Sequence, residues 1–264
     1  MQQRSRAIDV HTHLNTPGPQ PSEEELERAI RTARYYGIER LVLLGNLTAM
    51  GGPDPSMADV AAINSHTLRA MARYPETYIG FCYVNPAHPV SFLRDEIDRC
   101  VVQGGMKGLK LWIAVKATDP RLEPVMEAAA ELQIPVLHHA WYKQTVFIYN
   151  ESTPAEIAEL ARRFPEVPIV MAHLTGCGAR GVLDVADRPN VYVDTSGGQP
   201  ESGILEYAVG QLGPDRVLYG SDWPLRDFGV QIGRVRDADL PADVLERLLW
   251  RNAARLLRIE EDAP

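Results

Sequence analysis

The chain has 264 residues, of which 45% are hydrophobic and 23% are charged. This length fits one large domain, and the hydrophobic fraction is ordinary for a globular protein with an extensive core. The formal net charge of −8 and the pI of about 5.4 argue against a surface that binds nucleic acid or an anionic membrane. We therefore expect neither partner.

The three cysteines are widely spaced and odd in number, namely Cys82, Cys100 and Cys177. This pattern indicates neither a disulfide framework nor a zinc ribbon, and it favours a reducing compartment. The basic N-terminal residues are not followed by the hydrophobic segment of a secretion signal, and no hydrophobic run is long enough to cross a bilayer. We expect a cytoplasmic protein.

Short hydrophobic runs alternate with longer amphipathic segments along the chain. Each short run is typical of a strand buried on both faces of a parallel sheet. The expected strands cover residues 8–13, 40–45, 78–84, 106–113, 134–139, 168–173, 191–194 and 216–220. The expected helices cover approximately residues 23–36, 57–74, 90–102, 120–132, 154–164, 179–186, 201–212 and 241–257. Three of these helices follow residues that are good N-caps, namely Ser22, Ser56 and Thr153.

Strict alternation of strands and helices predicts right-handed crossovers and a parallel sheet. Eight such units within this length favour a closed (β/α)8 barrel, the TIM barrel of the α/β class, over an open doubly wound sheet. No change in composition indicates a second domain. We expect residues 1–264 to form one domain.

Polar residues gather where the expected strands end, which is where TIM barrels carry out their chemistry. Five of the seven histidines fall there together with one aspartate, namely His11, His13, His138, His139, His173 and Asp222. His66 and His88 fall in an expected helix and an expected loop. We expect these two to be solvated surface residues.

Strand geometry restricts which of these histidines can act together. Alternate side chains of a strand point to the same face, so His11 and His13 can hold one metal ion from the same side. Only one of the adjacent residues His138 and His139 can face the barrel axis. We expect this to be His139, with His138 packed against the helices.

The chain resembles the amidohydrolase superfamily through five segments that occur in the same order, namely Asp-Val-His-Thr-His, Pro-Val-Leu-His-His, Val-Met-Ala-His-Leu-Thr-Gly, Tyr-Val-Asp-Thr-Ser and Leu-Tyr-Gly-Ser-Asp-Trp-Pro. It is most similar to the branch called amidohydrolase family 2. That branch contains metal-dependent hydrolases, lactone hydrolases, and non-oxidative decarboxylases related to aminocarboxymuconate semialdehyde decarboxylase. The resemblance implies a mononuclear metal site at His11, His13, His139 and Asp222. It also implies that His173 acts in catalysis or joins the metal ligands.

Three imidazoles and one carboxylate are borderline ligands that suit Zn²⁺, with Mn²⁺ or Fe²⁺ as alternatives. We expect one divalent ion, with zinc preferred, to lower the pKa of a bound water towards about 7. In this hypothesis Asp222 binds the ion and accepts a proton from that water. His173 polarises the substrate carbonyl or protonates the leaving group.

Other side chains are candidates for contact with an anionic small molecule. Lys110 shares a strand face with Trp112, and we expect it to contact a substrate carboxylate or to support the metal site, with a carbamate that bridges two ions as the alternative. The further expected substrate-binding residues are Trp112, Trp141 and Trp223. The aromatic loop over residues 141–150 is a plausible lid, Arg180 and Arg226 could frame the pocket, and Asp194 could orient a histidine.

The preferred hypothesis is a metal-dependent hydrolase that acts on a lactone, amide or ester of a small organic acid. The alternative is a metal-dependent non-oxidative decarboxylase of an aromatic or unsaturated carboxylic acid. The third hypothesis is a binding protein, in which the barrel holds a purely structural metal or none. The compact chain favours the hydrolase, because the decarboxylases of this branch tend to carry longer insertions. Family analogy also favours a homo-oligomer.

Overall fold

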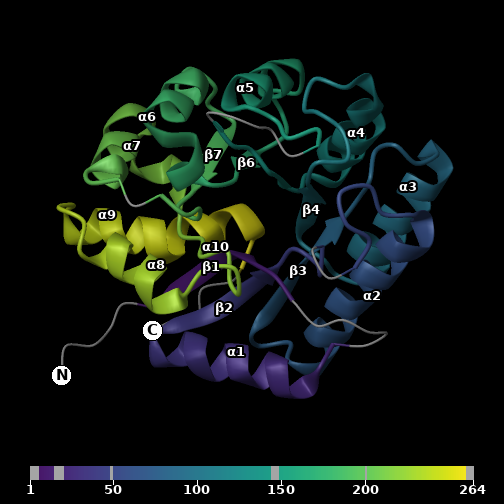
Figure 1. The fold of residues 1–264 in the computed structure, drawn as a ribbon, viewed down its shortest axis with the longest axis horizontal. Coiled ribbons are helices and arrows are strands. Elements are labelled where there is room, and N and C mark those ends of the chain that lie inside the picture. Colours follow the sequence, from purple (N-terminus) through teal and green to yellow (C-terminus); the bar gives the residue numbers. More distant parts are fainter. Residues whose placement is uncertain (1–5, 15–20, 48–49, 144–148, 200, 260–264) are drawn as a thin grey trace.

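Eight parallel strands form one sheet at the centre of the molecule, with helices around it (Figure 1). This computed structural model describes residues 6–14, 21–47, 50–143, 149–199 and 201–259. Within these residues the strands pair in chain order, each parallel to the next. The strands are β1 (Ala7–Thr12), β2 (Ile38–Leu43), β3 (Tyr78–Tyr83), β4 (Gly108–Leu111), β5 (Val136–His138), β6 (Ile169–Met171), β7 (Val191–Asp194) and β8 (Val217–Leu218).

The segment that follows β8 closes the sheet against β1. The Val10 amide donates to the Tyr219 carbonyl at 2.9 Å, and the Asp222 amide donates to the His11 carbonyl at 2.8 Å. The His13 amide donates to the carbonyl of Trp223 at 2.7 Å. The predicted (β/α)8 barrel is therefore confirmed.

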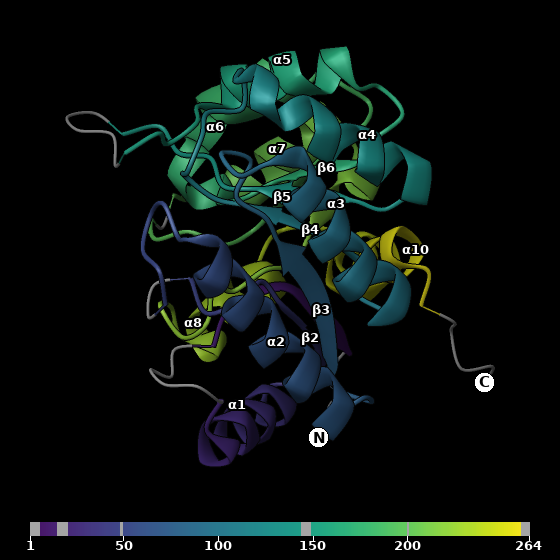
Figure 2. The same cartoon turned by 90° about the vertical axis from the view of Figure 1, so that its right-hand side faces the viewer.

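Helices pack around the strands, as a second view turned by 90° also shows (Figure 2). The α-helices are α1 (Glu23–Tyr35), α2 (Met57–Arg73), α3 (Val90–Ile97), α4 (Glu123–Leu132), α5 (Pro154–Arg163), α6 (Leu174–Val185), α7 (Ile204–Leu212), α8 (Phe228–Arg236), α9 (Ala242–Glu246) and α10 (Asn252–Leu257). Shorter 3₁₀ or π segments are η1 (Asp98–Gln103), η2 (Pro120–Leu122), η3 (Pro214–Arg216) and η4 (Arg247–Arg251). Among the helices described, none is long and apolar enough to cross a membrane.

The predicted helix starts agree with the observed caps. The hydroxyls of Ser22, Ser56 and Thr153 each accept a hydrogen bond from the backbone three residues on, and the last two residues form capping boxes with Asp59 and Glu156. Helix α8 was not predicted. Its two glycines lower its helix propensity, and Asp227 initiates it by accepting from the amides of residues 229 and 230.

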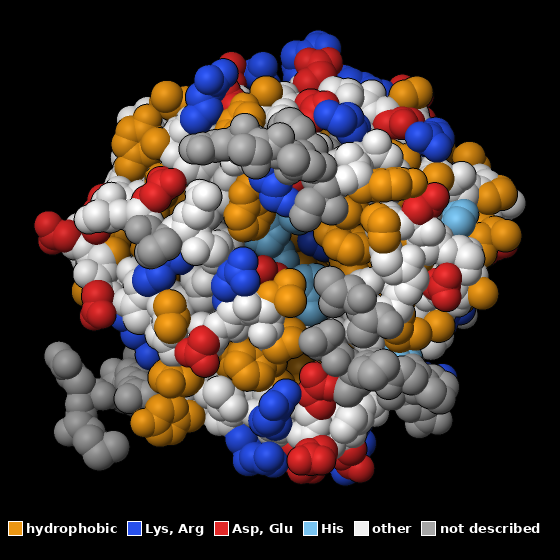
Figure 3. Space-filling view, viewed as in Figure 1, with side chains coloured by type: hydrophobic (Ala, Val, Ile, Leu, Met, Phe, Trp, Pro, Cys, Tyr) orange, Lys and Arg blue, Asp and Glu red, His pale blue; other side chains and the backbone are white. Residues whose placement is uncertain are grey.

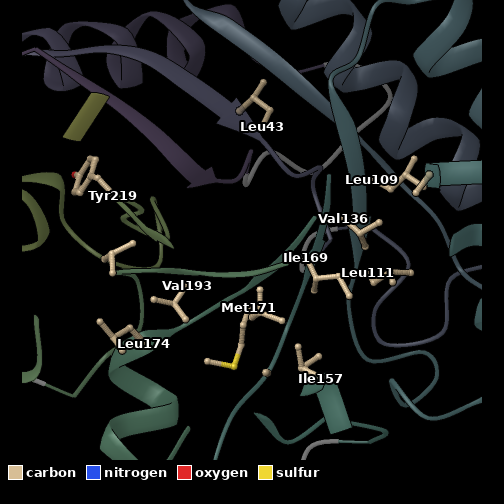
Figure 4. Close-up of a cluster of buried hydrophobic side chains, with 14 of the residues drawn as sticks. Leu43, Leu109, Leu111, Val136, Ile157, Ile169, Met171, Leu174, Val193 and Tyr219 are labelled. Carbon is tan, nitrogen blue, oxygen red and sulfur yellow. The ribbon is translucent and has the colours of Figure 1, made fainter. Parts of the chain in front are cut away.

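Two hydrophobic layers hold the barrel together. The larger layer lies between strands and helices and includes the side chains of Leu109, Val136, Ile169 and Val193, which Figure 4 shows near Ile157 of α5. The smaller layer uses alternate strand residues, namely Ile8, Val10, Val42, Leu44, Ile79, Phe81, Leu137, Val170, Ala172 and Leu218. Leu137 pairs in register with Lys110 on one side and with Val170 on the other, so this layer shares the face that carries the polar site.

A β-bulge in β1 changes which side chains face the barrel interior. Asp9 pairs with Leu41 and Thr12 pairs with Leu43, so three steps along β1 match two along β2. The extra residue brings His11 to the interior face after Val10, which already lies there. His11 and His13 then follow the regular two-residue alternation into the site.

The expectation that His66 is a solvated surface residue is wrong. Its side chain is fully buried on the face of α2 that also carries Ile63 and Ala70. The spacing of three and four residues places these positions on one face of the helix. Position on the buried face, and not the polarity of the imidazole, therefore determines the burial of His66. His88 is partly exposed, and its Nε2 lies 2.8 Å from the Pro55 carbonyl oxygen.

We predict that Leu137→Ala lowers the free energy of unfolding by about 2–5 kcal/mol, because it leaves a cavity in the closed barrel. Leu137 is fully buried, whereas Leu183 on α6 is 52% exposed. Leu183→Ala is the matched control and should change stability by less than about 0.5 kcal/mol. Urea unfolding measures both variants. Equal effects would contradict the assignment of Leu137 to the tightly packed layer.

Candidate metal centre and substrate cavity

A cavity of about 320 Å³ lies at the carboxyl ends of the strands. Figure 3 shows histidine side chains at the floor of a hollow in this face, with hydrophobic side chains around them. Most of the predicted site residues line this cavity, namely His11, His13, Lys110, Trp112, His139, Trp141, His173 and Asp222.

His11, His13 and Asp222 form one of two groups of possible metal ligands among the described residues, the other being His11, His173 and Asp194. One ligand atom from each lies within 4.8 Å of the others. The Nε2 atoms of both histidines lie 3.6 Å from Oδ1 of Asp222. Three of the four predicted ligands are therefore gathered around one point.

The second ring nitrogen of each histidine in this group faces an acceptor. Nδ1 of His11 lies 2.8 Å from Oδ2 of Asp194, and Nδ1 of His13 lies 3.0 Å from the Gly45 carbonyl oxygen. Carboxylate and carbonyl oxygens only accept, so each Nδ1 must carry the proton. The unprotonated Nε2 atoms then face Asp222, which is the arrangement that metal-binding histidines require.

The fourth predicted ligand, His139, lies on the same cavity wall but outside that group. Its Nε2 is 2.7 Å from Oε1 of Glu151, and its Nδ1 is 3.1 Å from Nε2 of His173. Nδ1 of His173 lies 2.9 Å from the Ser196 hydroxyl. His138 points away from the cavity, and its Nδ1 lies 2.7 Å from the carbonyl oxygen of His139.

Asp194 contacts three residues of the site through its two carboxylate oxygens. One carboxylate oxygen accepts from the His11 ring, and the other accepts from the backbone amides of His173 and Ser196 and from the Ser196 hydroxyl. Both oxygens are thus used within the protein. The structure shows the contact through which Asp194 was expected to orient a histidine.

Burial controls the charges of these groups. It lowers the pKa of His13 to about 3 and lowers the pKa of His11, His139 and His173 as well, so the imidazoles are neutral at neutral pH. Neutral imidazole is the form that binds metals. Burial also raises the pKa of Asp222 to about 7.

Two of the polar residues have unusual backbone conformations. His173 and Asp222 are non-glycine residues with φ of 67° and 66°. Such left-handed conformations are uncommon and cluster at functional sites, where surrounding contacts hold them. His173 lies two residues after β6 and Asp222 lies four residues after β8, and both line the cavity.

Lys110 places a positive charge in the cavity wall. Its side chain is 1% exposed, and in the described part of the chain no carboxylate lies within 4.0 Å of its ammonium group. Burial lowers the pKa of Lys110 to about 8, although Asp194 and Asp222 favour the charged form from a distance. A buried ammonium group is costly without a partner, and a bound anion would stabilise its charged form.

The aromatic candidates behave differently from one another. Trp112 and Trp141 line the cavity, and Trp141 lies over the rings of His139 and His173 with centroid distances of 6.4 and 5.1 Å. Trp223 does not line the cavity. Its ring stacks on Phe228 at 4.4 Å.

The two arginines that were expected to frame the pocket lie in different surroundings. Arg226 lines the cavity, but the Arg180 side chain is 78% exposed and lies beside Asp184. Of the expected lid, residues 144–148 lie outside the described residues.

The sequence analysis assigned no role to Glu151 or Ser196, and it included Lys143 only as part of the aromatic loop. Ser196 ends the Tyr-Val-Asp-Thr-Ser segment, so its position two residues after Asp194 was a usable signal. Glu151 comes directly after the loop over residues 141–150, and its contact with His139 appears only in the folded chain. No spacing rule in the sequence indicates that contact.

This geometry defines a metal-binding class of (β/α)8 barrel, and the family comparison agrees with it. The amidohydrolase family model matches residues 8–259. The chain therefore belongs to the amidohydrolase family, as its motifs indicated.

Several characterised proteins are similar to this chain. Gamma-resorcylate decarboxylase of Polaromonas sp. is 20% identical, in an alignment covering 88% of this chain and 87% of that protein. The crystal structure of 5-carboxyvanillate decarboxylase from Sphingomonas paucimobilis has a TM-score of 0.77 at 20% identity, covering 97% of this chain and 100% of that one. A dihydroxybenzoic acid decarboxylase from Polaromonas sp., crystallised with manganese and the inhibitor 2-nitroresorcinol, has a TM-score of 0.77 at 17% identity and covers 98% of both chains.

We predict that the protein binds one divalent ion and that His13→Ala weakens this binding by about 100-fold or more, since losing a ligand costs more than losing a supporting contact. His88→Ala is the control, because His88 lies outside the cavity lining. Competition with a chromophoric chelator measures both affinities. Equal affinities in the two variants would contradict the assignment of His13 as a ligand.

Proposed function

We propose that the protein is a metal-dependent non-oxidative decarboxylase of a small aromatic or unsaturated carboxylic acid. The similar proteins are decarboxylases of substituted benzoic acids by name, which favours this alternative over the hydrolase that the sequence analysis preferred. Their chains are covered almost completely, so the compact length of this chain does not count against decarboxylation.

The observation that carries the proposal is the arrangement of two kinds of group around one cavity. Possible metal-ligand donors occupy one part of its wall, and the ammonium group of Lys110, which has no carboxylate within 4.0 Å among the described residues, occupies another. An acid that carries a carboxylate and a second oxygen substituent can contact both. Trp112 and Trp141 supply flat apolar surfaces that suit an unsaturated ring.

The donor set fits a divalent ion. Two neutral imidazole Nε2 atoms face one carboxylate oxygen, and His139 lies beside them with Nδ1 unprotonated. We propose His11, His13, His139 and Asp222 as the residues that hold it. A bound ion would polarise substrate oxygens and stabilise negative charge on them. The sequence analysis preferred Zn²⁺, and the manganese in one similar structure makes Mn²⁺ an equal choice for testing.

The reaction needs a proton to replace the carboxylate. The bond between the ring carbon and the carboxylate carbon breaks, its electron pair stays on the ring carbon, and CO2 leaves. One proton is added to that carbon, so atoms and charge balance. In the protein without an ion, Asp222 can carry this proton near neutral pH because burial raises its pKa to about 7. Burial lowers the pKa of His173, so its imidazole is neutral near neutral pH and carries no second proton to donate.

Trp141 covers part of the wall that carries two of the proposed site histidines. Trp141 covers the rings of His139 and His173, and a Cβ on Gly176 would lie 2.6 Å from the Trp141 ring. This close approach explains why residue 176 is glycine. A dry site strengthens the attraction between Lys110 and a bound anion.

The decisive assay compares CO2 release from hydroxybenzoic acids with ring opening of lactones. The enzyme is loaded separately with Mn²⁺ and Zn²⁺, and the acid panel includes 2,6-dihydroxybenzoate and 5-carboxyvanillate. We expect CO2 release from at least one acid and none from the Asp222→Asn variant. Lactone hydrolysis without CO2 release from any acid would support the hydrolase hypothesis instead.

We predict that Lys110→Met raises KM for the acid by about 10-fold or more, because a hydrogen bond to a charged group contributes about 1.5–3 kcal/mol. Lys110 is charged below its pKa of about 8 and neutral above it, so kcat/KM of the unmodified enzyme should fall as pH rises through about 8. This fall should be absent in Lys110→Met.

Lys107→Met is the matched control, since Lys107 is exposed on the segment leading into β4. It should keep the pH profile of the unmodified enzyme. A pH profile that is the same in all three proteins would contradict the role of Lys110.

A further inference from the structure

We propose that Glu151 is a positioning residue that holds His139 in the ring orientation and tautomer needed to bind the metal ion. This inference rests on the same metal site as the proposed function. It does not depend on which reaction the site catalyses. Glu151 itself is assigned no contact with the ion or the substrate.

The loop after β5 brings Glu151 to His139 by regular backbone contacts. Ala140 and Ser152 form a parallel β-bridge, and the Trp141 amide donates to the Ser152 carbonyl at 3.0 Å. The Ser152 hydroxyl accepts from the Ala117 amide at 2.9 Å. Glu151 therefore immediately precedes the bridged residue Ser152, which leads into the N-cap of α5 at Thr153.

The carboxylate of Glu151 determines which ring nitrogen of His139 carries the proton. Oε1 lies 2.7 Å from Nε2, and a carboxylate only accepts, so a neutral His139 must place its single proton on Nε2. Nδ1 is then unprotonated and lies on the side of His173. Without Glu151, either nitrogen can carry the proton and the ring can rotate.

A second contact holds Glu151 in place. The glutamate side chain is 1% exposed, and its Oε2 lies 3.1 Å from Nζ of Lys143. This lysine also lies over the Trp141 ring, 5.6 Å from its centroid. One buried carboxylate thus connects a proposed ligand, a cavity-lining tryptophan and a lysine of the same loop.

Asp194 makes a contact with His11 that corresponds to the contact of Glu151 with His139. Asp194 accepts from the His11 ring as Glu151 accepts from the His139 ring. Outer partners of this kind typically contribute 10- to 100-fold in metal affinity. The structure therefore assigns to each of these two histidines its own buried carboxylate.

The test measures metal affinity and the His139 tautomer in the absence of substrate. Chelator competition with Mn²⁺ and Zn²⁺ should show affinity about 10- to 100-fold weaker in Glu151→Ala, with partial recovery in Glu151→Gln, whose amide oxygen can still accept. Glu156→Ala is the matched control: it removes another carboxylate paired with a lysine of a neighbouring loop, Lys116, and a helix cap. It should keep the affinity of the unmodified protein.

Nitrogen NMR of metal-free protein labelled with 15N-histidine provides a readout that a loss of stability alone would not change. We expect His139 to show a protonated Nε2 and an unprotonated Nδ1, and this pattern to be lost in Glu151→Ala. Comparison with the spectrum of His139→Asn identifies the signals.

An unchanged tautomer and affinity in Glu151→Ala, or equal losses in Glu151→Ala and Glu156→Ala, would overturn the inference. Neither measurement involves turnover. Failure of the decarboxylation assay would therefore leave this result standing, and failure here would leave decarboxylation open.

Discussion

The active site depends on hydrogen bonds to the ring nitrogens that face away from it. A neutral imidazole has one proton and one lone pair, so an acceptor behind the ring determines what the front of the ring can do. Asp194, the Gly45 carbonyl and Glu151 each accept a hydrogen bond from the N–H of a different histidine. The unprotonated nitrogens of His11 and His13 are consequently directed at Asp222. Burial reinforces the arrangement because it lowers the pKa of His11 and His13. Their second ring nitrogen then stays unprotonated and keeps its lone pair.

The packing of the (β/α)8 barrel offsets the free-energy cost of burying these polar side chains. Short strands end together at one face, and the interior layer below the polar residues is filled by aliphatic and aromatic side chains such as Leu137, Val170 and Phe81. That packing and the surrounding helices stabilise the fold, and this offsets the cost of the left-handed backbone at His173 and Asp222. In the described residues Lys110 is buried and has no carboxylate within ion-pair distance, and we propose that its charge meets an anionic substrate.

Much of the fold and part of the site could be predicted from the sequence. Alternation of hydrophobic strands with capped helices was sufficient for the barrel, and ordered motifs located the histidines and Asp222. Contacts that depend on loop folding were not predictable: Glu151 reaches His139 through a β-bridge, and Trp223 turns away to stack on Phe228. The bulge in β1 was also missed, because hydrophobic alternation does not reveal a single extra residue. The burial of His66 was also not predicted, because its polarity was given more weight than its position on the buried face of α2.

The central claim is that this site replaces a carboxylate with a proton and does not add water to a carbonyl. Turnover of an accepted acid in a mixture of D2O and 18O-labelled water tests this directly, with the product examined by mass spectrometry and NMR. The account predicts one deuterium on the carbon that carried the carboxylate in product formed from D2O, CO2 in equal amount, and no solvent oxygen in the product. A product that contains solvent oxygen and forms without CO2 would contradict it.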